Sequence, residues 1–123
     1  MKMNPEHKSV IFYFTKLMDP SREAEYHQWY IDTHIPDVMR TPELMAYHRF
    51  VNARDGDDDR KYAVMVECDS EDVDGVMEKM NDLFGHRGDR EKLRQLIEDG
   101  RLINYGKSTW SANFRRIFRA EAE

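Results

Sequence analysis

The chain has 123 residues, a mass of 14.7 kDa and a formal net charge of −5. This length favours a single domain over residues 1–123, with a core large enough to fold without disulfide bonds. Hydrophobic residues make up 40% and charged residues 35% of the sequence, which is typical of a folded protein and not of a disordered one. Apart from Arg115, Arg116 and Arg119 no basic stripe occurs, which argues against a nucleic-acid partner.

Cys68 is the single cysteine, so the sequence allows no intramolecular disulfide and no cysteine-based metal site. Residues 1–7 contain no apolar run, and we therefore expect no signal peptide. No stretch approaches the length that spans a bilayer. These features together predict no membrane partner and a cytoplasmic location.

Residues 10–14 form a continuous apolar run, Val-Ile-Phe-Tyr-Phe. Its β-branched and aromatic residues favour a strand. Because the run does not alternate with polar residues, we expect both of its faces to be buried. Helices cover one face of a sheet, so a second copy of the chain is the simplest cover for the other.

Asp19 followed by Pro20 is typical of a helix N-terminus. The helix is predicted to run to about Thr33, because Pro36 disfavours helical geometry at Ile35. One face of this helix gathers aromatic and titratable side chains within roughly a quarter turn. They are Tyr26, His27, Tyr30 and His34, with Trp29 beside them.

Residues 44–51 and 61–68 have the composition of two strands, and the acidic, glycine-containing loop between them indicates a hairpin. Ser70 is expected to cap a second helix that carries apolar residues as far as Phe84. Asp89 can cap a short third helix that ends at Gly100. The alternating residues 109–118 predict the last strand.

The resulting order, β-α-β-β-α-(α)-β, is that of the ferredoxin-like α+β fold. It predicts a four-stranded antiparallel sheet with both main helices on one face, and an extra short helix before the last strand. The other face of the sheet would be bare in a single chain. Pairing two such faces in a homodimer would bury both of them.

Residues 25–38 read EYHQWYIDTHIPDV, which resembles a stretch of EthD-like proteins with the pattern aromatic-x-x-W-Y-x-x-x-H-I/L-P-[DE]-V. These proteins belong to the dimeric α/β-barrel superfamily. Residues 41–44 also resemble the turn that comes before an aromatic strand in this family, although Glu43 replaces the glycine that is usual there. The resemblance implies the fold and a homodimer. It implies no single reaction, because the superfamily includes cofactor-free monooxygenases, isomerases, polyketide cyclases, lyases and haem-binding enzymes.

His34 is the candidate general acid or base, because imidazole exchanges protons near neutral pH. Its place in the last turn of the predicted helix would raise its pKa. Tyr30, one turn earlier, could stabilise an enolate-like intermediate, and Asp37 could orient the imidazole. A histidine before Ile-Pro could instead cap the helix by binding its free carbonyls.

Six further residues are candidate substrate contacts, since aromatic side chains suit a flat, apolar ligand. They are His27, His48, Tyr26, Trp29, Tyr13 and Trp110. His48 would enter the cavity of His34 only if its side of the strand faces the helices. A metal site formed by His27, His34 and His48 is an alternative, although no metal-binding spacing supports it. We expect no metal and no cofactor, as a glycine-rich phosphate loop is also absent from the sequence.

Three functions remain open. The first is a cofactor-independent enzyme that moves protons on an aromatic or polyketide-like small molecule, as an isomerase, cyclase or lyase. The second is a cofactor-free monooxygenase, in which a deprotonated substrate reacts with dioxygen. The third is a module that binds a small ligand or a partner chain without catalysis.

Overall fold

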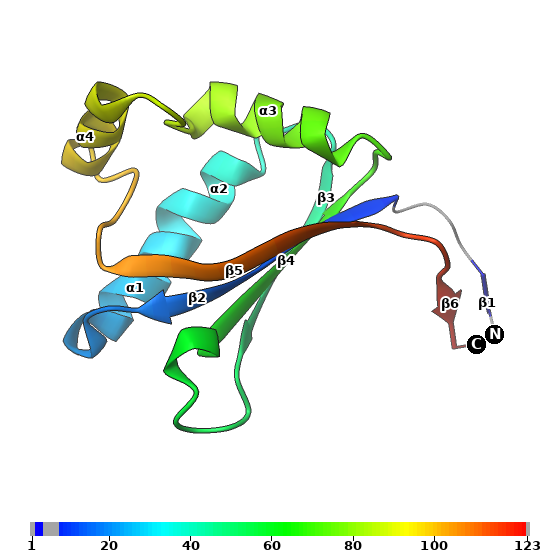
Figure 1. Ribbon diagram of the computed structural model, residues 1–123, viewed down its shortest axis with the longest axis horizontal. Helices are drawn as coiled ribbons and strands as arrows, with labels where there is room; N and C mark the ends of the chain where they lie inside the picture. The colour runs from blue at the N-terminus through cyan, green and yellow to red at the C-terminus, as the bar shows by residue number, and fades with distance from the viewer. Residues whose placement is uncertain (1, 4–7, 123) are drawn as a thin grey trace.

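The fold is built on a four-stranded antiparallel sheet with the strand order β3-β4-β2-β5. The computed structural model describes residues 2–3 and 8–122 (Figure 1). The strands are β2 (Ser9–Leu17), β3 (Leu44–Val51), β4 (Tyr62–Cys68) and β5 (Gly106–Arg115). The apolar run of residues 10–14 lies in β2, which pairs with β4 on one side and β5 on the other. The predicted ferredoxin-like α+β class is therefore confirmed.

The last strand differs from the sequence prediction in its bounds. The alternating pattern places it at residues 109–118, whereas β5 spans Gly106–Arg115. A register shift in the pairing of β2 with β5 falls between Phe14 and Thr15. Beyond β5, a short strand β6 (Ala120–Glu121) pairs with β1 (Lys2–Met3), well away from the main sheet (Figure 1).

The first helical region runs from Pro20 to Val38 and changes its winding along the way. A 3₁₀ turn (Pro20–Arg22) leads into α1 (Glu23–Trp29), a π-helical turn (Tyr30–His34) follows, and α2 (Ile35–Val38) ends it. As predicted, Asp19 caps the start, where its carboxylate accepts a hydrogen bond from the Ser21 N–H at 3.1 Å. We call this whole region the first helical rod.

The prediction that this helix ends at about Thr33 is wrong, because the rod continues through Pro36. Ile35 has helical φ and ψ of −60° and −47°, and its N–H donates to the carbonyl of Tyr30, five residues back. In a regular α-helix, a proline ring clashes with the carbonyl four residues earlier. The wider π-helical turn makes room for the ring, and Pro36 then lies in the first turn of α2, where its missing N–H costs little.

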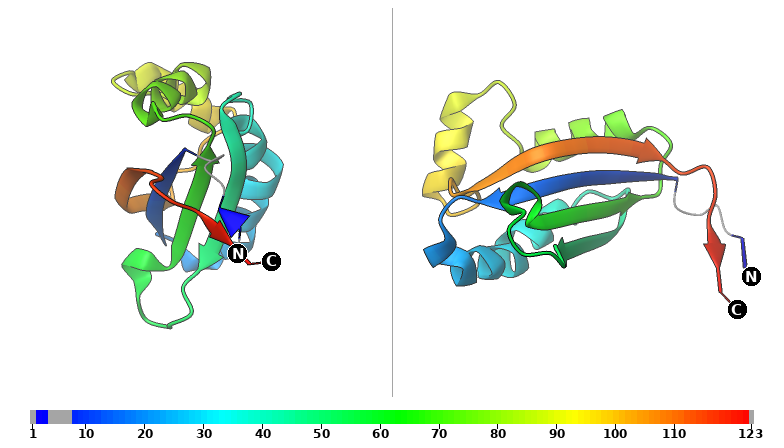
Figure 2. Two further views of the ribbon diagram at one scale, coloured as in Figure 1. Left: turned by 90° about the vertical axis from the view of Figure 1, so that its right-hand side faces the viewer. Right: turned by 60° about the horizontal axis from the view of Figure 1, so that its bottom comes forward.

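The first helical rod and α3 (Val73–Phe84) lie on the same face of the sheet (Figure 2). On β4 the residues alternate strictly between buried and half-buried, and those facing the helices form the core. One cluster packs Ile11, Val64 and Val66 of the sheet against Val38 and Val76 of the helices. Burial of these side chains contributes about 1.5–3 kcal/mol each.

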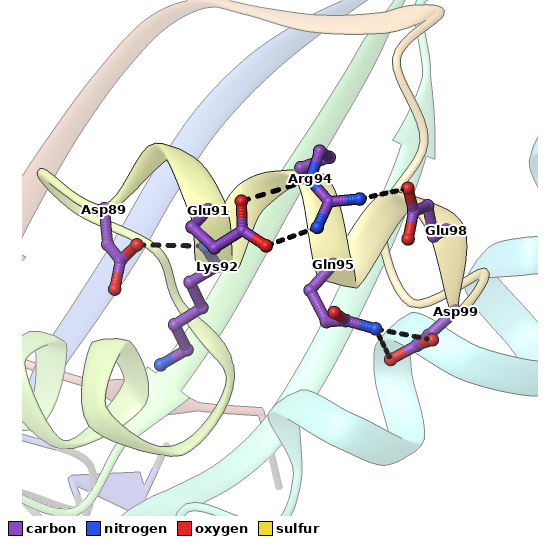
Figure 3. Close-up of polar contacts among 7 residues, drawn as sticks. All are labelled: Asp89, Glu91, Lys92, Arg94, Gln95, Glu98 and Asp99. Carbon is purple, nitrogen blue, oxygen red and sulfur yellow. Dashed lines mark hydrogen bonds and ion pairs between the residues drawn. The ribbon is translucent and has the colours of Figure 1, made fainter.

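The helix α4 (Arg90–Glu98) follows α3 and extends beyond the end of the sheet (Figure 1). Asp89 caps it by accepting a hydrogen bond from the Lys92 N–H at 2.9 Å. Arg94 bonds both Glu91 and Glu98 within the same helix (Figure 3). The polar contacts drawn there join residues of α4 and its two caps, so the helix stabilises itself locally.

Within the described residues, no helix covers the second face of the sheet, and aromatic side chains gather on it. Phe12 and Phe14 project from β2, and Trp110 and Phe114 project from β5. Trp110 and Phe114 are 48% and 49% exposed, while Ile11 on the helix side is 4% exposed. We expected both faces of β2 to be buried. Within one chain, only the face that packs against the helices is buried. We call this second face the open sheet face.

Candidate functional site

Two adjoining cavities lie between the sheet and the helices, and His34 lines both of them. The first, of about 390 Å³, is lined mainly by apolar side chains such as Val38, Met80 and Phe84, and we call it the apolar chamber. The second, of about 330 Å³, is lined by the rings of Tyr26, Trp29 and Tyr30, and we call it the aromatic chamber. The two chambers share Tyr13, His34 and Ser108.

The π-helical turn places the imidazole of His34 between aromatic rings. Its ring stacks on Trp29 with 4.6 Å between centroids and an angle of 18°. The rings of Tyr30 and His34 are nearly perpendicular, with 5.2 Å between their centroids. Neither ring nitrogen has a hydrogen-bond partner among residues 8–122. The capping role considered from the sequence is therefore not supported, because His34 lies inside the rod and not at its end.

Burial lowers the pKa of His34 to about 4, and the positive charge of Arg49 acts in the same direction. Asp37 opposes this effect only in part. The expectation that the helix end raises this pKa is thus wrong in direction, because desolvation outweighs the helix dipole. At neutral pH the imidazole is uncharged, and it can accept a proton from a molecule in either chamber.

Three phenols surround the point where the chambers meet. The hydroxyls of Tyr13 on β2 and Tyr47 on β3 share a hydrogen bond of 2.8 Å. Burial raises the pKa of both hydroxyls, and of Tyr30, above the ordinary value. All three phenols therefore stay protonated and can serve as hydrogen-bond donors. Tyr47 is not among the residues predicted from the sequence.

A buried cation lies behind Tyr30. The guanidinium of Arg49 lies 3.7 Å from the centre of the Tyr30 ring, and its Nη1 donates to Nδ1 of His27 at 3.2 Å. Its Nε and Nη2 are buried and find no hydrogen-bond partner in the described part of the chain. No carboxylate of those residues forms an ion pair with it either. The charge of Arg49 therefore acts on the phenols and imidazoles around it with little compensation.

Asp37 does not hydrogen-bond His34, contrary to the predicted base–orienter pair. Its carboxylate faces Arg101 instead, whose Nη1 lies 3.5 Å from Oδ2. Trp29 contacts the same residue, because its indole N–H donates to the Arg101 carbonyl at 3.3 Å. Asp37 and Trp29 thus attach the segment before β5 to the first helical rod, on either side of His34.

The structure places two of the predicted substrate contacts elsewhere. His48 lies on the open sheet face, where it stacks on Phe50 and its Nε2 lies 3.3 Å from Oε2 of Glu67. Trp110 also lies there, with its ring centre 5.6 Å from that of Phe14. The pleat turns both positions away from the helices, so neither side chain lies at the two chambers, and their role as substrate contacts stays a prediction.

His27 lines neither chamber, although it lies on the first helical rod as predicted. Its ring contacts Tyr62 and Arg49, and burial together with the Arg49 charge lowers its pKa. Because His48 lies on the opposite face of the sheet, the considered metal site of His27, His34 and His48 does not form. Within the described residues, no group of three His, Cys, Asp or Glu side chains is placed to hold a metal ion.

No protein-family model matches the chain, and no curated protein matches it in sequence. Two solved structures share its fold. HapK from Hahella chejuensis is 9% identical, with a TM-score of 0.65, over 94% of this chain and 98% of that chain. A protein from Shewanella loihica PV-4, described as "a putative monooxygenase", is 14% identical, with a TM-score of 0.52, over 90% of this chain and 95% of that chain.

At these identities the likeness shows the fold alone. It supports the ferredoxin-like architecture and leaves membership of the EthD-like family a prediction. The described residues also include no helix with the length and apolarity needed to cross a membrane.

The desolvated imidazole of His34 makes stability depend on pH in a defined direction. The pKa of His34 is about 4 in the folded protein, against an ordinary value of 6.5. Between these values the unfolded chain binds a proton that the folded protein does not, so stability falls as the pH drops from about 6.5 towards about 4. The loss due to this residue between roughly pH 7 and pH 4.5 should be about 2 kcal/mol.

The measurement is urea unfolding of the wild type and of His34→Gln at both pH values. The variant should lose about 2 kcal/mol less stability on acidification than the wild type does. His48→Gln, which removes a more exposed histidine on the other sheet face, is the matched control. If all three proteins lose the same stability on acidification, His34 is not a buried neutral base.

Proposed function

We propose that this protein is a cofactor-independent enzyme that transfers protons on a small aromatic or polyketide-like molecule, with His34 as the general base. The observation that carries the proposal is a half-buried, neutral imidazole without a hydrogen-bond partner in the described residues, facing two chambers lined by apolar side chains and phenols. Buried titratable groups with shifted pKa values that line cavities are enriched at active sites.

The geometry suits abstraction of a proton from a carbon next to a carbonyl group. His34 would accept the proton, and the negative charge would move to the carbonyl oxygen. The hydroxyls of Tyr30 and Tyr13 line the aromatic chamber and can donate hydrogen bonds to that oxygen. The buried charge of Arg49 favours the same anion. Isomerisation, cyclisation and elimination can each begin with this step.

The apolar chamber supports a flat, largely hydrocarbon substrate. Val38, Met80 and Phe84 contribute to its lining, and Ser111 and Asn113 of β5 are its polar members. Such a mixture of apolar walls and a few polar groups binds one orientation of a small molecule. Asp37 then has an indirect role, because it holds Arg101 and its charge raises the proton affinity of His34.

A cofactor-free monooxygenase is the second candidate, since the same deprotonation would activate an electron-rich substrate towards dioxygen. The description of the Shewanella protein favours this alternative, although its likeness concerns the fold. Oxygen uptake accompanying substrate loss would assign the monooxygenase function. Tight binding of aromatic molecules without any proton exchange would assign a ligand-binding module.

We also infer that the open sheet face is covered by a second copy of this chain. Its centre is aromatic, and exposed apolar patches of this kind mark interfaces. Beside the aromatic residues, Glu67 contacts both Arg116 and His48. A face that carries both signs of charge next to an apolar centre can match itself across a two-fold axis.

The proton-transfer proposal predicts exchange on the flat aromatic ketone 2-tetralone, whose C–H bonds next to the carbonyl are acidic. In D₂O, the wild-type protein should accelerate replacement of these hydrogens by deuterium, measured by proton NMR. Replacing the base by His34→Gln should lower the protein-catalysed rate about 100-fold or more. His48→Gln should exchange at the wild-type rate. A wild-type protein with no effect on exchange, or an unimpaired His34→Gln, contradicts the proposal.

The homodimer proposal predicts a molar mass of about twice 14.7 kDa in light scattering at micromolar concentration. Trp110→Glu and Phe114→Glu place a charge in the proposed interface and should yield a monomer. Ile31→Glu is the matched control, because Ile31 is 63% exposed on the first helical rod, on the other side of the sheet. A wild-type monomer, or dimers of all three variants, would refute this interface.

A further inference from the structure

One wall of the aromatic chamber comes from the segment that joins α3 to β5, for which the sequence suggests no role. This segment contributes His86, Leu102 and Ile103 to the lining. The other lining residues come from the first helical rod, including His34, and from β2 and β5. Two histidines from separate parts of the chain therefore line one chamber.

The backbone on both sides of His86 is fixed by hydrogen bonds. The N–H groups of Gly85 and Arg87 donate to the carbonyl and to the side-chain oxygen of Asn81, at 2.9 and 3.0 Å. The Asp89 N–H donates to the carbonyl of His86 at 2.9 Å. A Cβ at Gly85 would approach the Cα of Asn81 to 2.6 Å, so the tight turn requires glycine there. These contacts set the position from which His86 reaches the chamber.

The segment is also held at its far end, close to His34. Arg101 contacts Asp37 through its side chain and Trp29 through its carbonyl, and Trp29 stacks on His34. Between these ends, α4 is stabilised by its own capping and ion-pair contacts (Figure 3). The wall that carries His86 is thus anchored to the helical rod that carries His34.

We propose that His86 is a second catalytic residue of the proposed enzyme, which exchanges a proton with the substrate oxygen while His34 exchanges one with the substrate carbon. This proposal rests on the proposed function. The imidazole of His86 is half-buried and has no hydrogen-bond partner among the described residues, so it is available to a bound molecule and to solvent. His34, by contrast, is enclosed between Trp29 and Tyr30.

The proton balance of the step is simple. A nitrogen of His34 takes the proton from carbon as the C–H bond breaks, and the electron pair moves to the carbonyl oxygen. Protonated His86 gives its N–H proton to that oxygen, which leaves an enol and a neutral imidazole. In D₂O the proton held by His34 exchanges with solvent before the reverse steps, which then return the ketone with deuterium at carbon.

The other titratable groups of the chamber suit this role less well. They are Tyr13, Tyr26, Tyr30 and Lys107, together with Arg87 and Asp89 next to His86 in the chain. Burial holds the pKa of Tyr13 and Tyr30 above the ordinary value, so these phenols donate hydrogen bonds without releasing protons. Arginine does not act as an acid near neutral pH. Of the side-chain types that line this chamber, imidazole is the one that enzymes use most often as a general acid or base.

The test is 2-tetralone exchange as a function of pH for the wild type, His34→Gln, His86→Gln and His86→Ala. The wild-type rate should fall on both sides of a maximum, since a neutral His34 and a protonated His86 are both required. His86→Gln should lower the maximum about 10-fold to 100-fold and remove the fall at higher pH. Added imidazole should restore exchange in His86→Ala, an effect that a purely structural role would not produce.

Circular dichroism and thermal unfolding verify that each variant is folded, and Arg87→Gln is the matched control for a change in the same loop. If His34→Gln loses exchange while His86→Gln keeps the wild-type rate and pH profile, the proposal for His86 is overturned and the proposed function stands. If the wild type itself catalyses no exchange, both are overturned. Loss of activity in His86→Ala without rescue by imidazole also counts against a proton-transfer role.

Discussion

The π-helical turn at Tyr30–His34 is the constraint on which the candidate site depends. Because the Ile35 N–H bonds to the carbonyl five residues back, the helix passes Pro36 without a break. The same turn directs His34 towards the two chambers, with Trp29 stacked against its ring. It also carries the chain on to Asp37, which reaches Arg101. Turns of this kind occur frequently at functional sites, because an extra residue re-aims side chains within a helix.

Burial of two basic side chains near each other gives the site its electrostatic character. A cation without a carboxylate partner is costly to bury, and Arg49 is compensated here mainly by the faces of tyrosine rings and by His27. Its charge helps to keep His34 neutral, and it would stabilise a nearby anion. A structural core gains little from such an arrangement, whereas an enzyme that forms an enolate gains transition-state stabilisation.

The sequence was sufficient for the fold class and for the order of the main elements. Apolar runs and the Asp19–Pro20 pair mark local structure, which depends on neighbouring residues alone. The errors concern properties that local patterns do not determine. Both faces of the β3 strand carry aromatic or titratable residues, so its pattern could not decide whether Tyr47 or His48 faces the helices. The partnership of Asp37 with Arg101 spans 64 positions of the chain, beyond the reach of helical spacing.

The two faces of the sheet differ in character. The helix side encloses the chambers, and the open sheet face carries the aromatic patch, so each can be altered without direct contact with the other. The most direct test of the central claim is a crystal structure with 2-naphthol, a stable mimic of the enol of 2-tetralone. We expect the naphthol ring in the chambers, with the carbon next to its C–OH facing a nitrogen of His34 and its hydroxyl about 2.6–3.2 Å from the hydroxyl of Tyr13 or Tyr30. Naphthol bound elsewhere, with the two chambers empty, would contradict it.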